Sequence, residues 1–255
     1  MYNNDMKKII LILLVFVNII FSANAEPNYK YNVYNPYELN NKPLKTDNLK
    51  DASKVMFIMD FSNSMNDKIE GATKLEIALN TLSRILPQIP QGVQTGLRVY
   101  GHRGGFTYAD GCRASKLAVP LGTNNSTSIL NSLYKTSAVG WTPITYSLKQ
   151  AIYSDFAGIE GKKHIVLLTD GGENCDESPC TFAIELMKTR DDISIDVIAF
   201  AFGYSDQDAI NQLRCTALTT SGKIYTPNSK EELFNSLFES LNIDKSVQAT
   251  IRPSN

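Results

Sequence analysis

One acid and two hydroxyl side chains occupy alternate positions of the stretch Asp60-Phe61-Ser62-Asn63-Ser64. In a tight turn, this alternation can aim one carboxylate and two hydroxyls to the same side. Mg²⁺ takes six oxygens in an octahedral array, and proteins usually hold it with few carboxylates, several waters and one outside ligand. Ser62 and Ser64 can supply neutral oxygens, and Asp60 can supply negative charge directly or through a water. The stretch therefore predicts one side of a cation site.

Two further segments supply the same kind of ligand. Residues 140–143, Gly-Trp-Thr-Pro, place the hydroxyl of Thr142 in a loop before a predicted helix. Residues 169–173, Thr-Asp-Gly-Gly-Glu, place Asp170 beside two glycines, which let the backbone and a partner approach closely. Two carboxylates and three hydroxyls suit Mg²⁺, Mn²⁺ or Ca²⁺ and suit Zn²⁺ or copper poorly. The predicted metal ligands are Asp60, Ser62, Ser64, Thr142 and Asp170.

Each of these residues also has a simpler interpretation. Ser62 and Ser64 can cap the following helix, and Asp60 can hydrogen-bond a turn, as isolated Ser and Asp commonly do at the ends of strands. Glu173 is either an acid that supports a metal ligand or a solvated surface side chain. Three motifs in this order, each on the expected element, favour the metal site over these separate roles.

Both predicted acidic ligands follow apolar runs typical of buried strands. Val55–Met59 ends at Asp60, His164–Thr169 ends at Asp170, and Ile193–Phe202 is a third run of the same kind. Ligands of open parallel sheets bind beyond the carboxyl ends of the strands. We therefore expect the two acids to share one site although they lie far apart in the sequence.

The remaining elements complete an alternating pattern. Thr95–Tyr100 and Ser115–Leu121 predict a hairpin around the glycine-rich residues 101–111. His102 and Arg103 lie in this loop, and they either face the ligand or have a structural role in the loop. Residues 223–225 predict a last strand, and apolar residues at helical spacing predict helices at 75–86, 126–134, 143–154, 181–189, 207–218 and 233–241. This alternation predicts a mostly parallel α/β sheet covered on both faces.

The three motifs in this order resemble the von Willebrand factor A (vWA) domain, over about Lys54–Leu241. The five predicted ligands match all five positions of that family's metal-ion-dependent adhesion site (MIDAS). The resemblance implies a doubly wound, Rossmann-like α/β fold with strand order 3-2-1-4-5-6 and one antiparallel edge strand. It also implies that the Ser and Thr side chains contact the metal, that the acids act directly or through water, and that a bound protein often supplies a further carboxylate.

The first residues have the pattern of a cleaved secretory signal, residues 1–25. Lys7 and Lys8 precede the apolar run 9–21, and Ala-Asn-Ala at 23–25 precedes the expected cut. Because that run is shorter than the ~20 residues that span a bilayer, we expect no stable membrane insertion after cleavage and a periplasmic or secreted protein. Residues 26–53 predict an extended arm, 54–242 the vWA domain and 243–255 a tail. Segments 99–103, 173–180 and 213–215 further resemble exported bacterial members of the family.

The composition fits one globular domain with short tails, because the 255 residues are 43% apolar with a formal net charge of −1. A clustered basic face is not evident in the sequence, so we expect no nucleic-acid partner. In an oxidising compartment the four cysteines favour two disulfides over free thiols, with three possible pairings. Zinc is disfavoured because the sequence has only two histidines and no Cys-x-x-Cys pair. The cysteines are Cys112, Cys175, Cys180 and Cys215.

A binding module is the function that these features favour, with a partner protein that supplies an acidic residue to the cation. One alternative is a structural or assembly component of an envelope complex. Another is a hydrolase in which the cation activates water. The sequence lacks the Gly-x-Ser-x-Gly, His-Glu-x-x-His and P-loop motifs, and two histidines leave the commonest general base scarce. We therefore expect no enzymatic activity.

Overall fold

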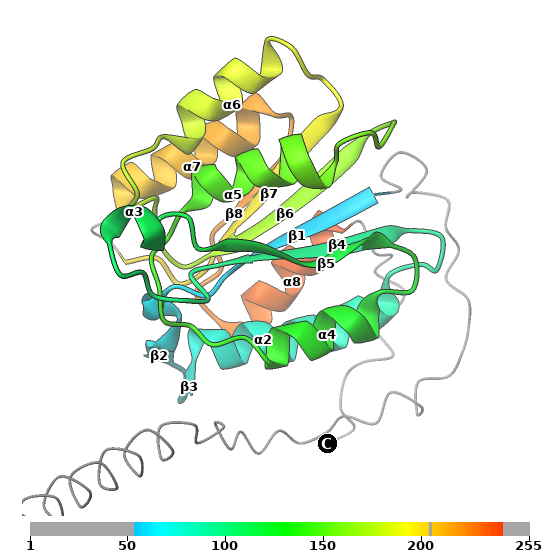
Figure 1. The fold of residues 1–255 in the computed structure, drawn as a ribbon. Helices are drawn as coiled ribbons and strands as arrows, with labels where there is room; N and C mark the ends of the chain where they lie inside the picture. The colour runs from blue at the N-terminus through cyan, green and yellow to red at the C-terminus, as the bar shows by residue number, and fades with distance from the viewer. Residues whose placement is uncertain (1–53, 204–205, 242–255) are drawn as a thin grey trace, which may run out of the picture. The chain divides into compact units, whose positions relative to one another are not determined.

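A computed structural model describes residues 54–203 and 206–241, which form a six-stranded sheet with helices on both faces (Figure 1). Neighbouring strands follow the order β5-β4-β1-β6-β7-β8, which is 3-2-1-4-5-6 along the chain. Every neighbouring pair is parallel except β4 and β5. The predicted fold class, hairpin and strand order are therefore confirmed. The strands are β1 (Lys54–Asp60), β4 (Gln94–Tyr100), β5 (Ser115–Gly122), β6 (Lys163–Thr169), β7 (Ile193–Ala199) and β8 (Ile224–Tyr225).

Two apolar cores lie on the two faces of the sheet. Successive side chains of a strand point to opposite faces, so Phe57 and Met59 of β1 enter one core, and Met56 and Ile58 enter the other. The first core packs against α2 (Lys74–Ile85), α4 (Ser126–Tyr134) and α8 (Lys230–Ser240) (Figure 1). The second packs against α5 (Ile144–Gln150), α6 (Pro179–Met187) and α7 (Gln207–Thr219). Burial on both faces explains the unbroken apolar run of β1.

A capping box fixes the start of α2. The side-chain oxygen of Thr73 accepts from the backbone N–H of Glu76, and the Glu76 carboxylate accepts from the backbone N–H of Thr73. A short antiparallel hairpin, β2 (Lys68–Ile69) and β3 (Ala72–Thr73), leads into this cap. This hairpin is not predicted from the sequence. Because Thr73 is the N-cap, Lys74 is the first residue of the helix.

Two helical segments differ from the sequence prediction. The predicted helix 143–154 begins as α5 one residue later, because Pro143 is the N-cap with a non-helical ψ of 70°. Its carbonyl accepts the first helical hydrogen bond, from the N–H of Ser147 (3.1 Å). It then ends in a π-helical turn, Ala151–Asp155. The Asp155 carboxylate receives two hydrogen bonds from Arg98 of β4, each 2.7 Å long, and this buried ion pair ties the end of α5 to the sheet. The hairpin loop also contains a short helix, α3 (Tyr108–Gly111).

The predicted signal peptide (1–25), arm (26–53) and tail (243–255) lie outside the described residues. Within residues 54–203 and 206–241, the helices are all too short or too polar to cross a membrane.

Candidate metal centre

Backbone hydrogen bonds hold three loops together beyond the carboxyl ends of β1 and β4. After β1 the chain enters a 3₁₀ turn, Asn63–Asn66, and the N–H of Asn63 donates to the carbonyl of Gly140 (3.0 Å). The N–H of Gly140 donates in turn to the carbonyl of Gly101, just after β4 (2.8 Å). Gly101 has φ +68°, and a Cβ there would lie 2.5 Å from the backbone nitrogen of Ser62. A larger residue at 101 would therefore push the metal loop out of place.

The oxygens of the predicted ligands converge where these loops meet. Ser62 Oγ lies 3.1 Å from Ser64 Oγ, and Ser64 Oγ donates to Asp170 Oδ1 at 2.8 Å. Adjacent oxygens held 2.0–2.1 Å from one Mg²⁺ ion in an octahedron lie about 2.9 Å apart. The spacing of these hydroxyl and carboxylate oxygens therefore fits such an ion. Thr142 lines the same open pocket as Ser62 and Ser64.

Asp60 lies deepest of the five, with no exposed surface. One of its carboxylate oxygens accepts from the N–H of Ser62 (2.6 Å) and the other from the hydroxyl of Thr169 (2.8 Å). Burial, together with the charge of Asp170, raises the pKa of Asp60 to about 6. A nearby cation favours the charged form of a carboxyl, so this buried acid is suited to a position beside a metal.

Lys74 is a member of the site that the sequence analysis missed. Its ammonium lies 2.9 Å from Asp170 Oδ2, and the two side chains are only 10% and 0% exposed. Lys74 is the first residue of α2, and its position in the sequence carries no sign that the side chain turns toward the loop after β6. Two carboxylates and one ammonium therefore meet here, with a summed charge of −1.

Asn174 and Glu173 hold the loop that carries Thr142. Asn174 Oδ1 accepts from the N–H of Thr142 (2.7 Å). The Glu173 carboxylate accepts from the N–H of Thr145 at the start of α5 (2.6 Å) and from that of Cys175 (3.0 Å). Burial raises the pKa of Glu173. Glu173 therefore joins the start of α5 to the loop after β6 and is not a solvated surface side chain.

The open pocket has a volume of about 420 Å³. Within the described residues, His, Cys, Asp and Glu side chains form no cluster of three or more that could hold a metal, so hydroxyls make up the rest of the donor set. Arg103 pairs with Asp110 inside the hairpin loop (2.9 Å), and neither it nor His102 lines the pocket. The pocket is lined by Ser62, Asn63, Ser64, Val139, Gly140, Trp141, Thr142 and Asn174.

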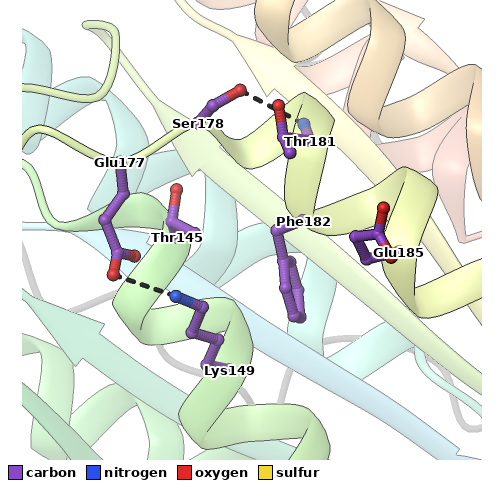
Figure 2. A pocket seen from close by; sticks show the side chains of 7 residues that line it. All are labelled: Thr145, Lys149, Glu177, Ser178, Thr181, Phe182 and Glu185. Carbon is purple, nitrogen blue, oxygen red and sulfur yellow. Dashed lines mark hydrogen bonds and ion pairs between the residues drawn. The ribbon is translucent and has the colours of Figure 1, made fainter.

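A second groove, of about 380 Å³, lies between α5 and α6 and shares no lining residue with the first (Figure 2). Lys149 and Glu177 form an ion pair across it (2.9 Å), and Phe182 supplies an apolar wall. The hydroxyl of Ser178 caps α6 by accepting from the N–H of Thr181 (3.1 Å). Because its charged groups are already paired, we place the candidate site in the first pocket.

Two disulfides connect the loops and helices around the site. Cys112, just after α3, bonds to Cys175 in the loop after β6, and Cys180 of α6 bonds to Cys215 of α7. The expectation of two disulfides is met in the structure, which also selects one of the three pairings left open by the sequence. Residues 175–180 are thereby linked at one end to the hairpin loop and at the other to α7.

The family model of the von Willebrand factor type A domain matches residues 54–240. The chain belongs to this family. A vWA relative, the protein YwmC of Bacillus subtilis (strain 168), is 33% identical over 189 residues, which are 71% of this chain and 80% of YwmC.

Two solved structures resemble the fold described here. One is the proximal thread matrix protein 1 of the mussel byssus with a zinc-occupied MIDAS motif, which has a TM-score of 0.57 and 21% identity over 75% of this chain and 45% of that one. The other is the pilus adhesin SpaC of Lactobacillus rhamnosus GG, with a TM-score of 0.60 and 12% identity over 78% of this chain and 30% of that one. At such identities the likeness shows the fold alone.

Proposed function

We propose that this vWA domain is a divalent-cation-dependent protein-binding domain that acts in the periplasm or outside the cell. The observation that carries the proposal is the gathering of five oxygen-bearing side chains around one open pocket. Three of them, Ser62, Ser64 and Thr142, line the pocket. The carboxylates of Asp60 and Asp170 accept hydrogen bonds from the N–H of Ser62 and the hydroxyl of Ser64. Ser62, Ser64 and Thr142 would hold the ion directly, and Asp60 and Asp170 directly or through water. Mg²⁺ suits this donor set best, with Mn²⁺ or Ca²⁺ as alternatives.

The charges around the pocket explain why an acidic partner fits. A bound divalent cation with mostly neutral direct ligands supplies an electrophilic position that a carboxylate can fill. Lys74 already offsets the charge of Asp170, so the site sums to −1 without the ion and to +1 with it. A partner's carboxylate would neutralise that remaining charge.

Binding is favoured over catalysis by the make-up of the pocket. His102 and His164 are not among its lining residues, and both oxygens of Asp60 accept hydrogen bonds from the protein itself. A free general base within reach of a cation-bound water is therefore not evident among the lining residues. Assembly of an envelope complex would use the same cation and differ only in the partner.

Export rests on two observations. The first residues have the pattern of a secretory signal, and all four cysteines are paired as disulfides, as is usual in oxidising compartments. The zinc-occupied MIDAS motif of the mussel protein and the adhesin role of SpaC support a metal-dependent binding function. The mussel structure also makes Zn²⁺ a necessary comparison in any test.

Isothermal titration calorimetry of the chelator-treated protein with Mg²⁺, Mn²⁺, Ca²⁺ and Zn²⁺ tests the proposal. We expect saturable binding by the wild type and none by the double variant Ser62→Ala/Ser64→Ala, because two ligands are lost. A matched control, Thr127→Ala/Ser128→Ala, removes two exposed hydroxyls from α4 and should titrate like the wild type. Equal binding by the wild type and the Ser62/Ser64 variant would exclude this metal site.

A further inference from the structure

Exposed apolar side chains gather beside the candidate metal pocket. In the described part of the chain, seven large apolar side chains are exposed, and four of them lie in the hairpin loop or the loop before α5. Single exposed apolar residues are ordinary, but a cluster commonly marks an interaction site. We call the three aromatic residues the aromatic rim: Phe106 (fully exposed), Tyr108 (43% exposed) and Trp141 (41%). The fourth residue, Val139 (52% exposed), lines the same pocket as Trp141.

Part of this apolar surface lines the candidate metal pocket. Val139 and Trp141 line the same pocket as Ser62 and Ser64. The ring of Tyr108 packs edge-on against the ring of Trp141, with centroids 5.4 Å apart. The Tyr108 hydroxyl donates to the carbonyl of Asn174 (3.0 Å), another lining residue. An apolar surface and a carboxylate-binding position therefore adjoin.

The rim is held in place before any partner arrives. The disulfide Cys112–Cys175 links the hairpin loop to the loop after Asp170. Gly111 packs so closely on Trp141 that a Cβ at this position would lie 2.3 Å from the indole ring. Side chains that are already ordered lose little entropy on binding, and rigid aromatic residues are common anchors of interfaces. The rings of Tyr108 and Trp141 are thus held in fixed positions although both stay exposed, and the fully exposed Phe106 extends from the same hairpin loop.

We infer that the partner is a protein segment in which an Asp or Glu stands beside an aromatic or aliphatic residue. Resting on the proposed function, this inference assigns the acid to the cation and its apolar neighbour to the aromatic rim. An open pocket of about 420 Å³ beside two fixed rings fits a peptide segment. A membrane surface would instead call for a broad apolar face with many basic residues.

A displayed peptide library with a fixed central Asp or Glu and random flanks provides the test. The probe is selected on the purified chain in Mn²⁺ and eluted with EDTA. We expect the eluted peptides to be enriched in Phe, Trp, Leu or Ile within three positions of the acid. Eluted peptides that show no enrichment of apolar residues near the acid would overturn the inference.

Variants locate the contact on the protein. Phe106→Ala should lower the affinity for the selected peptides about tenfold, which corresponds to the loss of an interface anchor that contributes ~1.4 kcal/mol. Leu218→Ala, which truncates an exposed side chain on α7, is the matched control and should bind them as the wild type does. Equal binding by the Phe106 variant and the wild type would also overturn the inference.

The outcomes separate this inference from the function on which it rests. If EDTA releases no peptides and the bound ones are released only by acid, their binding does not need the cation, and the proposed function itself would be contradicted. Peptides that require Mn²⁺ but bind the wild type and the Phe106 variant equally would contradict only the role assigned to the aromatic rim. Cation-independent binding of the wild type, but not the Phe106 variant, to phosphatidylglycerol vesicles would show a membrane-binding rim and overturn the inference.

Discussion

Lys74 places an ammonium beside Asp170, a residue that we propose as a metal ligand. The ammonium and a divalent cation carry charges of the same sign and both interact with this carboxylate. In the metal-free protein, the ammonium stabilises a side chain that has no exposed surface. The same residue should therefore weaken metal binding and stabilise the domain that lacks the metal.

Lys74→Met tests both effects, because it keeps most of the side-chain volume and removes the charge. We expect the variant to bind Mn²⁺ at least tenfold more tightly in calorimetry, a change of about 1.4 kcal/mol. Without metal it should lose about 3–5 kcal/mol of unfolding free energy, since a buried charge is left unpaired. Added Mn²⁺ should then raise its thermal midpoint more than that of the wild type.

Lys149→Met provides the control for this substitution. Its ion pair with Glu177 is 40% and 36% exposed, so the loss should stay within about 1 kcal/mol. Weaker Mn²⁺ binding by the Lys74 variant would show that the ammonium orients Asp170 instead of opposing the ion.

At the scale of residues, the sequence predicts which side chains form the candidate metal site but not which neighbouring residues hold them in position. Asp60 and Asp170 could be placed together because each follows a buried strand. Lys74 could not, because its reach toward Asp170 depends on how α2 lies on the sheet. The contribution of Asn174 also depends on a contact between two loops, which no local pattern encodes.

At the scale of elements, the hairpin loop and the loop after β6 depend on the disulfide Cys112–Cys175. The sequence predicts the strands and most helices because burial on one or two faces leaves a periodic apolar pattern. It does not predict α3 or the disulfide pairing, because a four-residue helix is too short for periodicity and the pairing is set by tertiary proximity.

Removal of either disulfide should destabilise the fold similarly. The bridges span 63 and 35 residues, and the loop-entropy estimate, which varies slowly with length, gives about 4 kcal/mol for each. Only Cys112→Ser/Cys175→Ser, however, frees the aromatic rim. We expect both double variants to unfold at lower urea concentration, and only this one to lose affinity for acidic-apolar peptides. Equal affinity losses in Cys180→Ser/Cys215→Ser would contradict a specific role for the first bridge.

At the scale of the whole molecule, His164 links stability to pH. It lies on β6, about 16 Å along the strand from Thr169, and its side chain is 13% exposed. Its ring nitrogens lie 3.0 Å from Ser194 Oγ and 3.5 Å from Ser240 Oγ, and Nε2 lies 3.6 Å from an Asp196 oxygen. Burial lowers the pKa of His164 below its usual 6.5, in spite of the opposing charge of Asp196.

This lowered pKa predicts the sign of an acid effect. As the pH falls through 6.5, the unfolded chain takes up a proton at His164 that the folded chain does not, so folding stability falls. We expect the urea midpoint to drop more between pH 7.5 and pH 5.5 in the wild type than in His164→Gln, whose amide does not titrate. Groups common to both proteins cancel in this comparison. A drop of the same size in both would show that His164 contributes nothing.

The two disulfides also determine how the domain would bear a mechanical load. A pull applied at Asp170 would act on the loop that follows β6. That loop is joined covalently to the β4–β5 hairpin through Cys175, and α6, which follows the loop, is joined to α7 through Cys180. Tension would therefore divide between two separate parts of the fold, and the loop could not peel away from the sheet while both bridges remain.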